Sequence, residues 1–131
     1  MNLSHEVVDL EGTSKTPKVL LNKADGYLLF QGRSIPENTF EFYNPINAWL
    51  DDYCKDPNPS TQLDVRLEYF NTSSSKCLLD LFKKLESLLR DNHQITVNWF
   101  FEKEDDDMKE AGEDYKAIVN VPFQIIEVDE L

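Results

Sequence analysis

Residues 69–77, YFNTSSSKC, contain four consecutive hydroxyl side chains between two hydrophobic runs. A hydroxyl in such a run can accept a phosphoryl group, which adds roughly −1.5 to −2 charges and three strong hydrogen-bond acceptors. The same segment can cap a helix, because Asn71, Thr72 or Ser73 can accept hydrogen bonds from backbone N–H groups that lack a partner within the helix. The residues alone leave both interpretations open, and residue chemistry by itself favours the cap.

The hydroxyl run lies where a predicted strand passes into a predicted helix. Residues 61–70 alternate between apolar and polar side chains, which predicts a strand with one buried face. Apolar residues then recur at helical spacing through residues 78–89, and residues 94–101 alternate again. Strand, helix and strand in this order predict parallel strands, with the hydroxyl run at their carboxyl edge. The expected buried set of the first strand is Leu63, Val65, Leu67 and Tyr69.

A phosphate at this position suits the N-terminus of a helix. The exposed amides and the helix dipole favour an anion there, and Lys76, about one turn further on, can pair with it. We therefore expect phosphorylation to leave the domain folded and to change what docks beside it. The expected neighbourhood of a phosphate on Thr72 is Asn71, Ser73, Ser74 and Lys76.

Two aromatic residues are expected on the uncovered face of the sheet, close to the hydroxyl run. Phe70 and Phe100 share the side of their strands that otherwise carries Arg66 and polar residues. Exposed aromatic side chains beside a modifiable hydroxyl predict a docking surface for a partner. The alternative is that one end of the chain covers them.

The remaining segments complete a single α/β domain. Residues 1–15 are polar and without periodicity, so we expect a flexible arm, with the domain over residues 16–131. Residues 16–22 and 26–33 predict a hairpin, Asn44-Pro45 predicts the start of a helix, and residues 121–128 predict a last strand. The expected fold is a mixed sheet of four to five strands with two main helices on one face.

Charge and composition restrict the partners. The chain has 25 acidic against 13 basic residues, a net charge of −12, which disfavours nucleic acids and anionic membranes. No secretory signal or membrane-spanning run is visible, and two cysteines suit a reducing compartment, so we expect a cytoplasmic protein. Proteins or small ligands remain as partners.

An acidic segment at residues 102–114 carries eight carboxylates. Asp105 and Asp107 resemble the start of a calcium loop, but Lys109 stands at the third ligand position and Lys116 at the twelfth. We expect a loop that enters a short helix, a solvated edge that can contact a basic patch on a partner. A small metal-binding protein or enzyme built on these carboxylates is the alternative function.

Other groups give no sign of catalysis or of a cofactor. His5 and His93 lack zinc-ligand spacing, neither cysteine has an evident base, and no glycine-rich phosphate loop is present. Glu37, Asn38 and Arg33 are expected to form a buried polar cluster with the acidic segment or to cap a helix. We therefore expect a protein that is not an enzyme and holds no metal, with an unmodified structural adaptor as a further possibility.

Five ordered segments together resemble the SiaC family of small bacterial regulatory phosphoproteins. They are GRSIPEN, FYNPINAWL, LEYFNTSSSK, VNWFFEKEDDDMKEAGEDY and VPFQII, and the resemblance extends from about residue 16 to residue 127. The chain departs from the family's commoner Tyr-Pro-Glu-Asn at SIPEN, where Ile35 takes the place of the aromatic residue. The resemblance also implies an α/β layout like that of the anti-sigma-factor antagonists (STAS-like domains).

The resemblance implies a function as well as a fold. It implies that a dedicated kinase phosphorylates Thr72, that a PP2C-type phosphatase removes the phosphate, and that the unphosphorylated form activates a diguanylate cyclase. The output would be cyclic di-GMP and the aggregation or biofilm growth that it promotes. The acidic segment is also a hallmark of the family, so the expected partner-binding residues are Phe70, Phe100, Arg66, Asp105, Asp107, Glu110 and Glu113.

Overall fold

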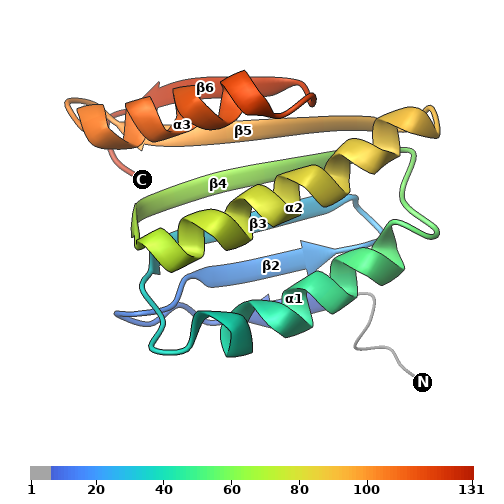
Figure 1. Cartoon of the computed structure of the whole chain (residues 1–131), viewed down its shortest axis with the longest axis horizontal. Helices are drawn as coiled ribbons and strands as arrows, with labels where there is room; N and C mark the ends of the chain where they lie inside the picture. Colours follow the sequence, from blue (N-terminus) through green and yellow to red (C-terminus); the bar gives the residue numbers. More distant parts are fainter. Residues whose placement is uncertain (1–6) are drawn as a thin grey trace.

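Six strands form one mixed sheet, in the order β1-β2-β3-β4-β5-β6, in the computed structural model, which describes residues 7–131 (Figure 1). The first three strands are antiparallel, and β3, β4, β5 and β6 are parallel. The predicted βαβ unit is therefore confirmed. The strands are β1 (Val7–Leu10), β2 (Lys18–Asn22), β3 (Tyr27–Ser34), β4 (Ser60–Phe70), β5 (Gln94–Glu102) and β6 (Phe123–Val128).

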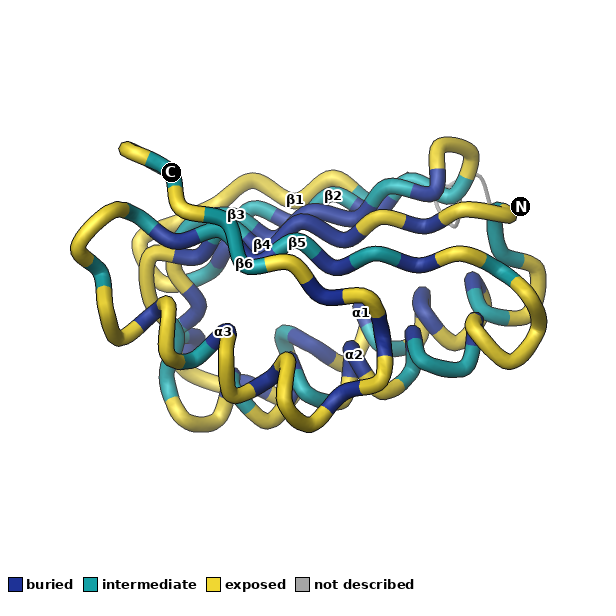
Figure 2. Tube along the Cα trace, turned by 90° about the horizontal axis from the view of Figure 1, so that it is seen from above, coloured by how far each residue is buried: buried dark blue, intermediate teal, exposed yellow. Residues whose placement is uncertain are grey.

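Within residues 7–131, three helices cover one face of this sheet and leave the other face uncovered (Figure 2). They are α1 (Thr39–Tyr53), α2 (Thr72–Arg90) and α3 (Asp106–Ile118). Each helix connects two neighbouring parallel strands, so all three begin at the carboxyl edge of those strands. The expectation of helices on one face is confirmed. The expected two main helices are joined by a third, because the acidic segment continues into 13 helical residues.

The core lies between the sheet and the helices. The stripe predicted for α2 is buried at Leu78, Leu81, Phe82, Leu85 and Leu88, whereas Leu89 is 37% exposed. This buried stripe of α2 packs against the side chains of the central strands that point toward the helices. The largest completely buried side chains include Trp99, Tyr43, Tyr53, Phe30 and Phe82.

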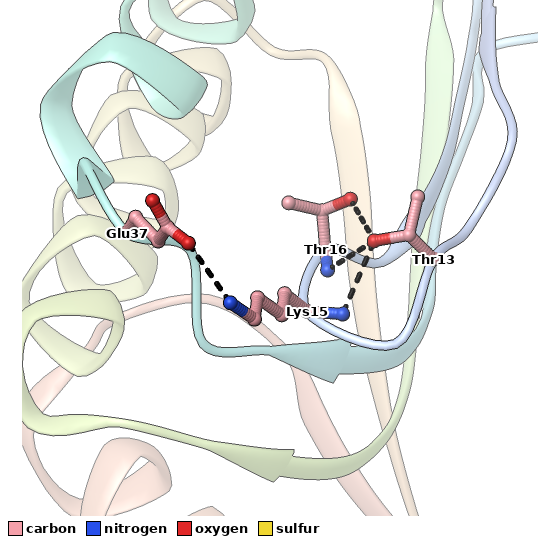
Figure 3. A network of polar contacts seen from close by, with 4 residues as sticks. All are labelled: Thr13, Lys15, Thr16 and Glu37. Atoms are coloured by element: carbon pink, nitrogen blue, oxygen red, sulfur yellow. Dashed lines mark hydrogen bonds and ion pairs between the residues drawn. The ribbon is translucent and has the colours of Figure 1, made fainter.

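The N-terminal part of the described chain differs from the expected flexible arm. Residues 7–10 form the edge strand β1 on β2, which accounts for the sixth strand. Residues 13–16 form a hydrogen-bonded turn, in which the Thr13 hydroxyl accepts from the backbone N–H groups of Lys15 and Thr16 (Figure 3). The Lys15 side chain also forms an ion pair with Glu37, with a distance of 2.8 Å. These interactions join residues far apart or belong to a local turn, so hydrophobic periodicity does not reveal them. The rest of the predicted arm, residues 1–6, lies outside the described residues.

Helix α1 begins six residues before the predicted start at Asn44-Pro45. Asn38 is the N-cap, and its side chain accepts from the Glu41 backbone N–H at 3.1 Å. Of the two roles expected for Asn38, helix capping is therefore confirmed. Pro45 lies inside the helix, where it removes one backbone donor. The buried stripe through Tyr43, Ile46 and Leu50 outweighs that loss.

An irregularity in β4 reverses the expected orientation of its last residues. Leu67 and Tyr69 pair with the consecutive residues Gly32 and Arg33 of β3, so Glu68 is one extra residue on β4. Such a bulge shifts the alternation by one. Tyr69, expected to be buried, is 53% exposed. Phe70, expected on the uncovered face, packs against the core beneath the helices.

Candidate functional site at the carboxyl edge of the sheet

Asn71 holds the N-terminus of α2 at the end of β4. Its backbone is extended, and its side chain accepts from the Ser74 N–H at 2.9 Å. Its own N–H donates to the Ser34 carbonyl of β3 at 3.0 Å. Because Asn71 fills the capping role, the Thr72 side chain is left without a structural hydrogen bond among the described residues. The first residue of α2 therefore presents a free hydroxyl.

The four hydroxyls of the run have different environments. Thr72 and Ser73 are exposed, and Ser75 is partly buried and donates from Oγ to the Thr72 carbonyl at 2.7 Å. Ser74 is completely buried. An enzyme can therefore reach Thr72 and Ser73, whereas Ser74, which was expected in the neighbourhood of the phosphate, has a structural role.

Ser74 belongs to a buried chain of hydroxyls that joins β3, α1 and α2. Ser34 Oγ donates to Ser74 Oγ at 2.9 Å, and Ser74 Oγ donates to the Ser34 carbonyl at 3.0 Å. The Tyr43 hydroxyl lies 2.6 Å from Ser34 Oγ. Burial raises the pKa of Tyr43 to about 12, so this phenol stays protonated and available as a donor. The chain fixes the first turns of α1 and α2 relative to each other.

Helix α3 is hydrogen-bonded to the first turn of α2. The Tyr115 hydroxyl donates to the Ser75 carbonyl at 2.7 Å, and burial raises the pKa of this phenol above its usual value. Trp99 Nε1 donates to the Met108 carbonyl at 2.9 Å, and Gly112 lies against the Trp99 ring. The Phe70 ring meets Trp99 edge to face with ring centroids 5.9 Å apart. The β4 end, the α2 start and α3 thus form one packed unit.

A pocket of about 220 Å³ lies between the end of β4 and the start of α3. Phe70, Met108 and Ala111 give it apolar surface, Tyr69 contributes an exposed aromatic ring, and three carboxylates complete its lining. Only Asn71 separates Phe70 from Thr72 in the chain. We name this the edge pocket; its residues are Glu68, Tyr69, Phe70, Asp105, Asp107, Met108 and Ala111.

The predicted aromatic pair is divided between the two faces of the sheet. Phe100 lies on the uncovered face, as expected, with the Arg66 guanidinium carbon 4.3 Å from its ring centroid. This is a cation–π contact. Phe70 lies on the covered face because of the bulge at Glu68. The predicted docking pair of Phe70 and Phe100 is therefore wrong as a single patch.

The uncovered face also carries a buried carboxylate. Asp64 is 8% exposed and accepts from the Tyr27 hydroxyl at 2.7 Å and from the Gln62 and Asn98 amides, each at 3.0 Å. Burial, followed by the hydrogen bond to Asp64, raises the pKa of Tyr27 to about 12. This network supplies hydrogen bonds to the buried Asp64 carboxylate in the middle of the sheet.

The acidic residues of α3 have separate roles. Asp105 is the N-cap, accepting from the Met108 N–H at 3.1 Å, whereas Asp107, Glu110 and Glu113 are exposed. Of these, only Asp105 and Asp107 line the edge pocket. Within residues 7–131, no group of three or more histidine, cysteine, aspartate or glutamate side chains is arranged to hold a metal ion.

Sequence reasoning missed two exposed aromatic residues at this edge. Phe40, in the first turn of α1, is 68% exposed, and Tyr69 is 53% exposed. Phe40 precedes the predicted helix start at Asn44-Pro45, so the helical periodicity did not include it. No pattern in the sequence signals either exposure. A second pocket, of about 560 Å³, lies between α1 and α2. Its lining includes several charged side chains, among which Lys84 pairs with Asp51 at 2.7 Å.

The helices described in residues 7–131 include none long and apolar enough to cross a membrane.

A family model described as "SiaC family regulatory phosphoprotein" matches residues 10–128. The chain is 30% identical over 121 residues to an uncharacterised protein of Pseudomonas aeruginosa (strain UCBPP-PA14), covering 92% of this chain and 96% of that protein.

Two solved structures are similar throughout. SiaC of Pseudomonas aeruginosa is 28% identical, with a TM-score of 0.85 over 93% of this chain and 98% of that one. The crystal structure of the diguanylate cyclase SiaD in complex with its activator SiaC, also from P. aeruginosa, gives a TM-score of 0.87 at 28% identity. That match covers 92% of this chain and 99% of the matched chain.

Proposed function

Because the chain belongs to the SiaC family of regulatory phosphoproteins, we propose that it is a non-catalytic switch whose unphosphorylated form binds and activates a diguanylate cyclase. The observation that carries this proposal is the exposed Thr72 hydroxyl at the first turn of α2, which forms no hydrogen bond within residues 7–131. It lies in a domain similar over nearly its whole length to an activator solved in complex with its cyclase.

Thr72 is the proposed site of phosphorylation. Its side chain is exposed and carries no structural hydrogen bond among the described residues, so modification breaks no contact of the fold. The phosphate would lie at the start of a 19-residue helix, where the free amides and the dipole favour an anion. The exposed Lys76 lies one turn further along.

The phosphate acts on docking through desolvation. A partner that covers Thr72 must remove water from its side chain, which is inexpensive for a hydroxyl and costly for a dianion without a matched partner. An affinity loss of about a hundredfold needs only about 2.7 kcal/mol. A local change of charge is therefore sufficient to switch occupancy while the fold remains intact.

Three partners follow from this proposal. A kinase places the phosphate, a PP2C-type phosphatase removes it, and the cyclase is the effector. Two enzymes and an effector must approach the same edge of the sheet, so their binding is mutually exclusive. We place all of these steps in the cytoplasm, where a reducing environment suits the free Cys54 and Cys77.

The acidic segment does not favour the alternative of a metal-dependent enzyme. Asp105 is engaged as the N-cap of α3, and the neighbouring carboxylates are exposed. A role in charge complementarity with a partner accounts for them better than chelation does. Calorimetry with Mg²⁺, Mn²⁺ and Ca²⁺ tests that alternative, since tight stoichiometric binding would support it.

The direct test is reconstitution with the cyclase from the same organism. The purified chain is added to that cyclase, and cyclic di-GMP formation is measured before and after treatment of the chain with the cognate kinase. We expect activation by the unmodified chain and loss of activation after kinase treatment. A cyclase whose rate is unchanged by the unmodified chain would contradict the proposed function.

A further inference from the structure

We propose that the edge pocket receives an arginine or lysine side chain of the cyclase, and that this contact sets the partner over Thr72. The inference rests on the proposed function, because it names the chemistry of the effector segment that docks there. It is carried by the combination of an apolar floor and a carboxylate rim in one pocket.

The floor of the pocket suits an aliphatic stem. Phe70 and Met108 belong to the core or pack against it, and Ala111 leaves space because its side chain is only a methyl group. Phe70 is fixed by ring contacts to Trp99 and Tyr115. The floor is therefore rigid before a partner arrives, which reduces the entropy lost on binding.

The rim determines the sign of the occupant's charge. Glu68 and Asp107 are exposed, and neither forms an ion pair or hydrogen bond through its side chain among residues 7–131. Asp105 adds a third carboxylate. An acidic or phosphorylated ligand would be repelled here, whereas a cation gains up to three acceptors. The net charge of −12 also steers a basic segment toward the chain.

Arginine and lysine combine the two required properties. Their methylene stems pack on apolar surface while their charged heads stay in polar surroundings. The exposed ring of Tyr69 offers a further surface for a cation. A neutral apolar side chain would leave the rim carboxylates desolvated without partners, which is unfavourable.

The location of the pocket connects this contact with the switch. Phe70 is the last residue of β4 and Thr72 the first of α2, and α3 is tied to this turn through the Tyr115–Ser75 hydrogen bond. A partner residue seated in the pocket brings the rest of its segment over the start of α2. The long-range attraction of the pocket for a cation is screened by salt, whereas the desolvation of a phosphate on Thr72 acts at contact.

The test uses charge-neutral variants that keep the fold. Glu68→Gln with Asp107→Asn removes two rim charges, and Asp105→Asn removes the third while retaining a good N-cap. The control, Glu11→Gln with Asp80→Asn, removes two charges from exposed positions that lie outside the pocket and outside the acidic segment. Ala111→Leu fills the pocket without changing charge. Melting temperatures identify any variant that fails to fold.

Affinity for the cyclase is measured at low and high salt. We expect the Glu68/Asp107 variant to bind at least tenfold more weakly and with a smaller salt dependence, the control to stay within about twofold, and Ala111→Leu to weaken binding as well. Unchanged affinity in the charge variants, with or without loss in Ala111→Leu, would overturn the assignment of a basic occupant. Absence of binding by the wild-type chain would overturn the proposed function, and this inference with it.

Discussion

Ser34 Oγ donates a hydrogen bond to Ser74 Oγ across 2.9 Å, between two side chains that are both completely buried. The bond joins the end of β3 to the third residue of α2, 40 positions further along the chain. This bond gives Ser74 a structural role, whereas the Thr72 and Ser73 hydroxyls are accessible at the surface. Because Ser75 is partly buried and its hydroxyl donates to the Thr72 carbonyl, the fold narrows the proposed phosphorylation site to the exposed Thr72 and Ser73.

Replacing Ser74 by alanine is expected to destabilise the domain by about 1–3 kcal/mol. The change removes the acceptor of the Ser34 hydroxyl and the side-chain donor to the Ser34 carbonyl, so the buried Ser34 hydroxyl keeps Tyr43 but loses one of its two side-chain partners. Urea denaturation measures the free energy of unfolding. Ser73→Ala, at the exposed neighbouring position, is the matched control and should stay within about 0.5 kcal/mol of wild type. Equal stabilities for the two variants would show that the buried hydroxyl chain does not hold the start of α2.

Gly112→Ala is expected to destabilise the domain by about 1–3 kcal/mol, against the usual gain from alanine in a helix. A Cβ atom at this position would clash with Cδ1 of Trp99, a buried ring whose Nε1 also donates to the Met108 carbonyl. Thermal unfolding of Gly112→Ala beside the exposed control Glu113→Ala gives the comparison. A Gly112→Ala protein as stable as the control would mean that α3 can move away from the sheet at little cost.

Stability is expected to fall as the pH rises from about 10 to about 12. The Tyr43 phenol has its pKa raised to about 12 by burial, whereas the unfolded chain titrates near 10. In this interval the unfolded chain has released the proton that the folded chain retains, so the free energy of unfolding declines with pH. Tyr27, with its pKa also raised to about 12, contributes in the same direction.

Denaturation curves at several pH values between 8 and 11 measure this decline. Tyr43→Phe should be less stable near neutral pH, because Ser34 loses a partner, but should lose less stability above pH 10. If wild type and Tyr43→Phe showed the same dependence on pH, ionisation of Tyr43 would not be the cause.

Local signals in the sequence were sufficient for the architecture around Thr72. Alternation in residues 61–70 and 94–101 and the leucine stripe between them predicted parallel strands joined by α2. Asn71 was among the predicted caps, and it is the residue that caps α2. These features depend on periodicity and on residue types next to each other in the chain, which a single sequence contains.

Features that depend on distant partners were not predictable. The extra residue at Glu68 becomes visible only when β4 is paired with β3, and it moves Phe70 to the covered face and Tyr69 to the surface. The buried Ser74 of α2 finds its hydrogen-bond partners in the hydroxyl and the carbonyl of Ser34, at the end of β3. The edge pocket likewise needs α3 to fold back onto the end of β4, so its three carboxylates appear in the sequence only as part of a longer acidic segment.

The central claim is that a phosphate on Thr72 prevents docking of the cyclase while the fold is kept. The most direct measurement is the affinity of the cyclase for the chain phosphorylated on Thr72, with the site verified by mass spectrometry, beside the unmodified chain and Thr72→Ala. The account predicts that the phosphorylated chain binds about a hundredfold more weakly at an unchanged melting temperature. It predicts that Thr72→Ala binds even after exposure to the kinase, and that Thr72→Asp binds poorly. Equal affinity of the phosphorylated and unmodified chains, or a phosphate found on Ser73 instead of Thr72, would contradict it.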